Sequence, residues 1–148
     1  MSYQLINSYC SPNPFIVVDN DHLTMEWSEK QGTTSSPEIF GPPVWFTLHN
    51  GAAHLPKEIS PISLTRIKNF IDGIPDMLVA CANCSEHSRA FIESRRPVIN
   101  NLKSGDDVFK FYVDFHNYVN EKLGKPIMGY ETARKLYSGK KAMVFKYH

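Results

Sequence analysis

Two cysteines separated by two residues stand in the segment CANCSEHSRAF, residues 81–91, and a histidine follows three positions later. Cys81, Cys84 and His87 are residue types that bind zinc, and a C-x-x-C pair can equally form a redox-active disulfide. The two chemistries need different partners elsewhere in the chain. A structural zinc ion needs four ligands, whereas a redox disulfide needs an acceptor for its electrons.

The zinc hypothesis requires a second set of ligands. Structural zinc is usually held by two ligand pairs brought together by the fold. Cys81 and Cys84 form one pair, and two of Cys10, His87 and His116 would have to complete the set. The sequence contains no second C-x-x-C and no H-x-x-H. A zinc-stabilised helical interaction module therefore stays open as the alternative function.

Other interpretations of the cysteine pair make different demands on the fold. A thioredoxin-like site needs a βαβ pattern beside the pair, but the flanking segments have helical periodicity. The two thiols could also be buried without any chemistry, since free cysteine is often buried. At the start of a helix, backbone N–H groups would stabilise the reactive thiolate. With no second redox pair in the chain, a bound cofactor is then the natural electron acceptor.

A helix in front of the pair is predicted over the segment GPPVWFTLHNGAAHLP, residues 41–56. Its prolines suit the first turn of a helix, and Pro56 ends the pattern. Helical spacing places four residues on one face of this helix. They are Trp45, Leu48, His49 and Ala52.

Three further long helices and one short helix follow. One begins at the cap candidate Ser60 and is expected to end or bend at Pro75; another runs from about residue 81 to 94. The fourth extends over residues 104–124, with Ser104 as its cap and Gly124 as its end. A short fifth helix is predicted over 129–139, and no strand alternation appears after residue 41. The expected fold is an all-α four-helix bundle plus a short fifth helix.

Residues 1–38 differ from this helical domain, which we expect to span residues 39–148. Prolines and the segment EKQGTTSS, residues 29–36, interrupt any helical period in the first part of the chain. Residues 15–27 favour a short strand or hairpin. We therefore treat residues 1–38 as an N-terminal extension.

Composition excludes several classes of partner. The 148 residues carry a formal net charge of +1 and no long basic stretch, so nucleic-acid binding is not expected. No apolar run approaches the roughly 18 residues of a membrane span, and no secretory signal is visible, which predicts a cytoplasmic protein that is not secreted. Three cysteines are too few, and odd in number, for a secreted disulfide scaffold.

Three motifs in order carry a resemblance to a known family. They are W-x-x-x-H at residues 45–49, C-x-x-C at 81–84 and H-N-x-V-N-x-K-L-G-K at 116–125. This order resembles the flavin-dependent sulfhydryl oxidases of the Erv/ALR family, over about residues 40–137. The segment GPPVW before the first helix and the His87 after the cysteine pair are most similar to compact members encoded by large DNA viruses. The resemblance implies a helical bundle that holds FAD beside the C-x-x-C disulfide.

The resemblance also implies roles for individual residues. Gly41 and Trp45 should line the flavin cavity, and His49 should donate to the cofactor. The adenosine part should contact His116, Asn117 and Asn120. Lys122 and Lys125 should lie near the ribose, the pyrophosphate or the ring edge. Tyr137 stands where family members place an aromatic residue near the adenine. No metal is implied.

The implied reaction joins two protein thiols into a disulfide while oxygen becomes hydrogen peroxide. By the resemblance, Cys81 receives the client's thiolate, and Cys84 faces the flavin. The expected partners are a dithiol protein, with a thioredoxin-like carrier as one candidate, molecular oxygen and a second copy in a homodimer. A viral origin would place the protein in the host cytoplasm or the virion. Two features of the family are missing, because Val113 and Tyr130 stand where cellular members often have a disulfide, and no second C-x-x-C accompanies Cys10.

Overall fold

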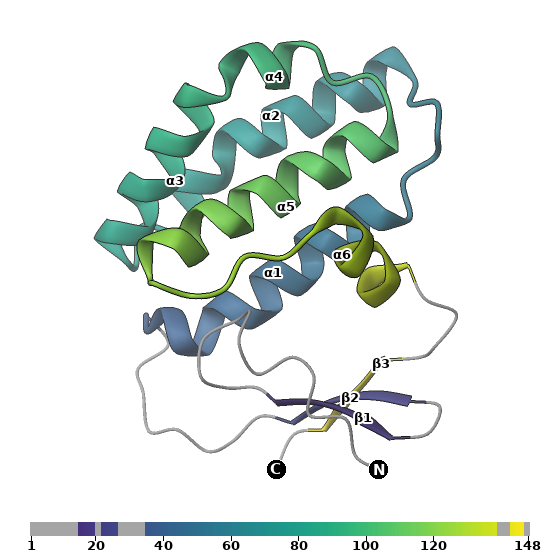
Figure 1. Cartoon of the computed structure of the whole chain (residues 1–148). Coiled ribbons are helices and arrows are strands. Elements are labelled where there is room, and N and C mark those ends of the chain that lie inside the picture. Colours follow the sequence, from purple (N-terminus) through teal and green to yellow (C-terminus); the bar gives the residue numbers. More distant parts are fainter. Residues whose placement is uncertain (1–14, 20–21, 27–34, 139–142, 147–148) are drawn as a thin grey trace.

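Six helices make up most of the computed structural model, which describes residues 15–19, 22–26, 35–138 and 143–146. Four of them are long and form the bundle (Figure 1): α1 (Pro37–Ala53), α2 (Pro61–Met77), α3 (Ala82–Ser94) and α5 (Gly105–Lys122). Two are short: α4 (Arg96–Asn100) and α6 (Tyr130–Tyr137). This arrangement confirms the all-α, four-helix prediction.

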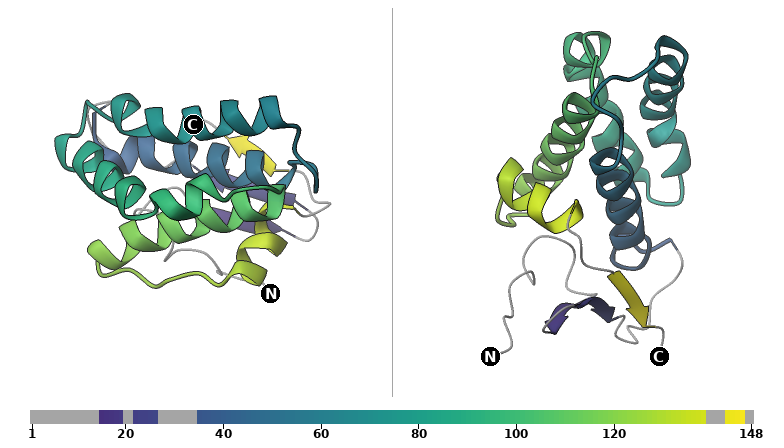
Figure 2. Two further views of the ribbon diagram at one scale, coloured as in Figure 1. Left: turned by 90° about the horizontal axis from the view of Figure 1, so that it is seen from above. Right: turned by 90° about the vertical axis from the view of Figure 1, so that its right-hand side faces the viewer.

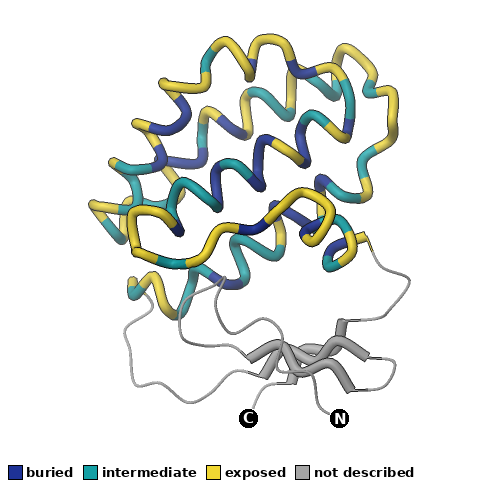
Figure 3. Tube along the Cα trace, viewed as in Figure 1, coloured by how far each residue is buried: buried dark blue, intermediate teal, exposed yellow. Residues whose placement is uncertain are grey.

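Helix α5 supplies the largest part of the core. It packs against α1 on one side and α3 on the other, while α2 packs on α3 and α6 lies on α1 and α5 (Figures 1 and 2). Contact on two sides explains why the buried positions of α5 extend beyond a single narrow stripe (Figure 3). Phe109 and Phe111, two residues apart, are both almost fully buried.

Capping side chains fix where two of the bundle helices begin. The Ser60 hydroxyl accepts a hydrogen bond from the Ser63 backbone N–H, at 3.2 Å. Ser104 and Asp107 form a reciprocal capping box, in which each side chain accepts a bond from the other residue's backbone N–H. Gly124 has a φ of 64°, a conformation that glycine adopts easily, and it follows the end of α5. The predicted caps and the predicted end of this helix are confirmed.

Two helix boundaries and one additional short helix differ from the sequence-based expectation. Helix α1 begins at Pro37, so Pro42 and Pro43 lie inside it rather than in its first turn. Helix α2 continues past Pro75 to Met77. The short helix α4, with Pro97 in its first turn, was not predicted; a proline at this position costs no intrahelical hydrogen bond.

A three-stranded sheet joins segments from both ends of the chain. Strands β1 (Phe15–Asp19) and β2 (His22–Glu26) pair antiparallel, in the segment that predicted a hairpin. Strand β3 (Met143–Lys146) pairs parallel with β2, with Leu23 opposite Met143. The expectation of no strand after residue 41 was therefore wrong. A four-residue strand whose partner lies more than a hundred positions away leaves no local periodicity to detect.

The start of α5 touches the loop that follows α1, and this contact leads to a stability prediction. The Gly105 backbone N–H donates to the Pro56 carbonyl at 3.1 Å, and a Cβ added at Gly105 would lie 2.7 Å from that same oxygen. Because the obstructing atoms include backbone, we expect Gly105→Ala to lower the free energy of unfolding by about 1–3 kcal/mol. Gly73→Ala is the matched control, since its Cβ would meet no atom within 4 Å. Chemical denaturation of both variants measures the difference; equal stabilities would contradict the tight approach.

Candidate functional site

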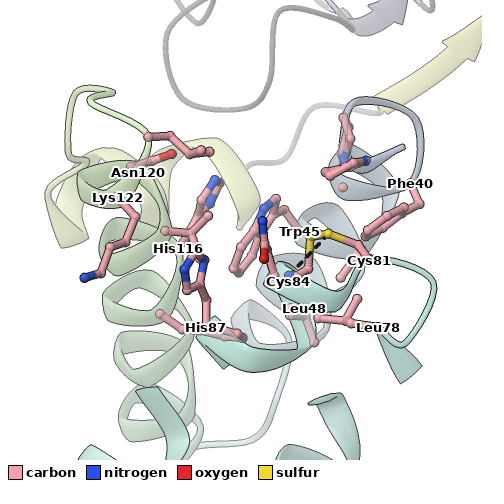
Figure 4. A pocket seen from close by; sticks show the side chains of 18 of the residues that line it. Phe40, Trp45, Leu48, Leu78, Cys81, Cys84, His87, His116, Asn120 and Lys122 are labelled. Atoms are coloured by element: carbon pink, nitrogen blue, oxygen red, sulfur yellow. Dashed lines mark hydrogen bonds between the residues drawn. A yellow bond between two sulfur atoms is a disulfide. The ribbon is translucent and has the colours of Figure 1, made fainter. Parts of the chain in front are cut away.

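A cavity of about 300 Å³ opens between α1, α3 and α5. Both cysteines of the C-x-x-C pair line it, and Trp45, His87, His116, Asn120 and Lys122 line it with them (Figure 4). Most of the remaining wall is apolar, with Phe40, Leu48 and Leu78 among its members. The cavity therefore combines a disulfide with flat aromatic surface and with positive charge at one side.

Cys81 and Cys84 are joined as a disulfide at the start of α3. Cys81 is the N-cap residue of this helix, and its sulfur accepts a hydrogen bond from the Cys84 backbone N–H at 3.2 Å. The same first turn is held to the end of α2, because the Ser85 hydroxyl donates to the Pro75 carbonyl at 2.8 Å. When the disulfide opens, this backbone N–H can stabilise a thiolate on Cys81.

Aromatic rings from three helices stack behind and along the cavity wall. The rings of Trp45 and His116 are parallel, with centroids 4.1 Å apart. The His49 Nε2 and the His116 Nδ1 lie 2.9 Å apart in a buried hydrogen bond, in which one ring donates and the other accepts. Tyr137 of α6 stacks on His49 at 4.6 Å. Together these contacts connect α1, α5 and α6 at one point.

Burial keeps His49 neutral. The side chain is 1% exposed, and this desolvation, with the neighbouring His116 as a lesser cause, lowers the pKa of His49 to about 3. A neutral imidazole carries one N–H and one bare nitrogen. Among the described residues, neither the His49 Nδ1 nor the Asn120 Nδ2 has a hydrogen-bond partner. Buried polar atoms are normally paired, and Asn120 lines the cavity, so its unpartnered Nδ2 indicates a place where a ligand completes the structure.

Six residues that the sequence suggested for a cofactor are brought together with the two cysteines. They are Gly41, Trp45, His116, Asn120, Lys122 and Lys125. The two lysines come from different elements, since Lys122 ends α5 and Lys125 follows Gly124. The Lys125 N–H also donates to the Asn120 carbonyl at 2.8 Å, which fixes the backbone at this turn.

The other three suggested residues do not line the cavity. His49 and Tyr137 form the layer directly behind His116 and Trp45. Asn117 uses its whole amide on Met128, donating to the carbonyl and accepting from the N–H, both at 2.8 Å. The structure thus gives Asn117 the task of holding the segment after α5, and its contact with a cofactor stays a prediction.

Two polar residues that were not among those suggested for a cofactor, Asn83 and His87, also line the cavity. Asn83 lies between the cysteines, and His87 lies one helical turn beyond Cys84. The spacing of three residues from Cys84 was the signal that could have placed His87 on the same face of α3. The apolar wall residues carried no comparable signal, because they follow the same periodicity as the core.

Comparisons with known proteins agree with this geometry. The sequence profile of the Erv1 / Alr family matches residues 42–138. The chain is 36% identical over 107 residues to a protein of Invertebrate iridescent virus 6 whose name describes an FAD-linked sulfhydryl oxidase, covering 70% of this chain and 96% of that one. An FAD-linked sulfhydryl oxidase of African swine fever virus is 28% identical over 103 residues, covering 66% and 79%.

This chain belongs to the Erv1 / Alr family. The crystal structure of the yeast Erv1 core has the same fold, with a TM-score of 0.65 at 21% identity, covering 76% of this chain and 92% of that one. A second structure, of the FAD binding domain of Erv1 from Saccharomyces cerevisiae, gives a TM-score of 0.57 at 22% identity and covers 69% and 94%. The fold expected from the resemblance is confirmed.

The zinc alternative gains no support from this Erv1 / Alr chain. Within the described ranges, no group of three or more His, Cys, Asp or Glu side chains could hold a metal ion. Cys81 and Cys84 are bonded to each other, and Cys10 lies outside the described residues.

None of the described helices is both long and apolar enough to cross a membrane.

The lowered pKa of His49 predicts how the stability of this Erv1 / Alr domain depends on pH. In the unfolded chain the His49 imidazole binds a proton near pH 6.5, whereas in the folded chain it binds one only near pH 3, because burial lowers its pKa. The stabilising contribution is therefore complete above pH 6.5 and is lost as the pH falls toward 3, at no more than about 1.4 kcal/mol per pH unit. Urea unfolding at several pH values should show a weaker acid dependence for His49→Phe than for the exposed control His54→Phe. Identical slopes would contradict the neutral buried imidazole.

Proposed function

We infer that this chain is an FAD-dependent sulfhydryl oxidase. It converts two thiols of a protein substrate into a disulfide and passes two electrons and two protons to oxygen, giving hydrogen peroxide. The observation that carries this conclusion is the Cys81–Cys84 disulfide in the wall of an aromatic cavity with lysines at one side. We assign the activity to residues 39–148, with residues 1–38 as an N-terminal extension.

The cavity residues fit FAD. The unpartnered Asn120 Nδ2 offers a buried hydrogen-bond donor, and Lys122 and Lys125 supply the positive charge that a pyrophosphate attracts. Trp45 offers a flat aromatic face. A Cβ added at Gly41 would meet no atom within 4 Å, so the wall is open at that point. When bound, FAD would accept the electron pair from the dithiol and pass it to oxygen.

The protein's own part of the reaction is thiol–disulfide exchange. A client thiolate attacks the Cys81 sulfur, the Cys81–Cys84 bond breaks, and Cys84 leaves as a thiolate. A second client thiolate then attacks the client sulfur of the mixed disulfide, which releases the oxidised client and the Cys81 thiolate. The N–H of Cys84 stabilises this leaving group because it already points at the Cys81 sulfur. The reduced pair then holds the two electrons, with Cys84 in the cavity wall.

The deciding experiment is to purify the chain and record its visible absorption and its metal content. We expect a yellow protein with about one FAD per chain, which consumes oxygen when a dithiol is added. A colourless protein that contains zinc would support the interaction module instead.

The client is a dithiol protein, and we propose a thioredoxin-like carrier because its two neighbouring thiols suit the exchange at Cys81. A reduced carrier should be oxidised faster than a protein with one accessible thiol, and equal rates would argue against this choice. Relatives from several viruses support a location in the host cytoplasm or the virion. Fractionation of infected cells tests it.

We also propose that two copies associate through the surface between α1 and α2. Ile62, Phe70 and Met77 of α2 are 63%, 54% and 81% exposed, and their spacing keeps them on one side of the helix. Two apolar hollows of about 440 and 300 Å³ lie beside Phe70 and share Thr47 and Leu48 of α1. Sedimentation should find a dimer for the parent and a monomer for Phe70→Asp. Val98→Asp, at an exposed apolar residue of α4, is the control.

A further inference from the structure

We propose that Arg134 is a positioning residue for the cofactor site: its contacts with Asp106 and Phe109 hold α6 against α5 and so keep Tyr137 stacked on His49. This inference rests on the proposed function, because it assigns a role in retaining FAD. It concerns the layer behind the cavity wall, and none of the residues Arg134, Asp106 and Phe109 lines the cavity itself.

Arg134 makes two contacts with the first turns of α5. Its guanidinium donates to an Asp106 oxygen at 2.5 Å, in an ion pair whose side chains are 34% and 53% exposed. The same guanidinium carbon lies 3.8 Å from the ring centroid of Phe109, which is fully buried. An exposed ion pair alone contributes little, but stacking on a buried ring adds a cation–π attraction that water screens less.

A series of side-chain contacts connects Arg134 to the cavity wall. Tyr137 lies one helical turn after Arg134, and its ring stacks on His49 at 4.6 Å. The His49 ring lies edge-to-face on Phe109 at 6.2 Å, so Arg134 and His49 contact the same phenyl ring. His49 in turn is hydrogen-bonded to His116, which lines the cavity.

Helix α6 depends on such contacts because it has little stability of its own. It has eight residues, far fewer than an isolated helix needs in water, and its N-cap Gly129 provides no side-chain cap. The chain has no cysteine after Cys84, so no disulfide can attach α6 to the bundle. A second polar contact, from the Tyr130 hydroxyl to Asp114 at 2.5 Å, attaches the first residue of the helix. Arg134 attaches the half of the helix that carries Tyr137.

Weakening this attachment should reduce the affinity for FAD without touching the cofactor's contacts. If only a fraction of the chains has α6 docked, the apparent affinity falls by that fraction. Because the ion pair is partly exposed, added salt should weaken the docking, whereas a reducing agent should not.

The test compares Arg134→Met and Arg134→Lys with the control Arg96→Met. Arg96 is 35% exposed and pairs with Asp72 at 2.5 Å, which matches the exposure and the short ion pair of Arg134. Arg96 also pairs with Glu93 at 2.9 Å. Two quantities are measured: amide hydrogen exchange of residues 130–137 in the FAD-free protein, and the FAD dissociation constant at low and at high salt.

We expect Arg134→Met to speed exchange in α6 and to weaken FAD binding by about threefold to tenfold, with less salt dependence than the parent. Arg134→Lys should recover part of both effects, because it keeps the charge but loses the planar stacking group. The control should change neither quantity. Unchanged exchange and affinity in Arg134→Met would overturn the proposal. A parent chain that binds no FAD would overturn the proposed function instead, and faster exchange in α6 would then still support the attachment by Arg134.

Discussion

Cys81→Ser and Cys84→Ser should each reduce the oxidation of a dithiol by about a thousandfold or more. Both sulfurs are needed, because the exchange consumes one bond between them and a single thiol cannot restore it. FAD should remain bound in both variants, since most of the cavity wall comes from other side chains. Oxygen consumption with dithiothreitol measures the loss, and the visible spectrum measures the bound FAD.

The two variants should differ in their spectra. Cys81→Ser leaves the Cys84 sulfur as a free thiol in the cavity wall, where its thiolate can give a broad long-wavelength absorption with the oxidised flavin. Cys84→Ser removes that sulfur and should lack the band. The third cysteine is the control: Cys10→Ala should keep near-normal activity with dithiothreitol. Full activity in either variant of the C-x-x-C pair would contradict the proposed chemistry.

His116→Ala should purify with much less FAD and with a stability lower by about 2–4 kcal/mol. The substitution removes the hydrogen bond to His49, leaving a further buried ring nitrogen of His49 without a partner, and it removes the ring that stacks on Trp45. It also enlarges the cavity at a position that is 4% exposed. Thermal unfolding and the absorbance ratio of flavin to protein measure the two effects.

Added FAD should restore part of the lost stability of this variant, because a ligand that binds only the folded state raises its stability. His54→Ala is the control, since His54 is an exposed histidine whose Nδ1 contacts only the nearby Asn50 carbonyl among the described partners. Normal FAD content in His116→Ala would remove His116 from the cofactor site.

Most of the helices were predictable because they carry several local signals that agree, whereas the short helix α4 was not predicted. Ser104 with Asp107 at its start and Gly124 at its end bound the fourth bundle helix almost to the residue. Pro42 and Pro43 misled the prediction for α1, because they suggested a first turn where the chain is already helical. Strand β3 was missed because the partner that stabilises it is distant in sequence.

The site was predictable where side chains share a helix face and unpredictable where a backbone contact decides. Trp45 of the W-x-x-x-H motif and His116 of the H-N-x-V-N-x-K-L-G-K motif both line the cavity. Asn117 follows His116 in the second of these motifs, but its side-chain amide is hydrogen-bonded to the Met128 backbone. This contact depends on how the segment after α5 folds back. Arg134 had no motif at all, and its role follows from the stacking on Phe109.

The wall of the cavity is assembled from segments that are far apart along the chain, since it includes Gly41 of α1, the cysteine pair of α3, and Lys125 beyond α5. During synthesis the chain emerges from its N-terminus, so this cavity cannot form until residue 125 has left the ribosome. FAD can therefore bind only late in the synthesis of a chain, after all the segments that line the cavity have been made. A chain truncated before residue 125 could contain the complete C-x-x-C motif and still lack the site for the FAD that accepts its electrons.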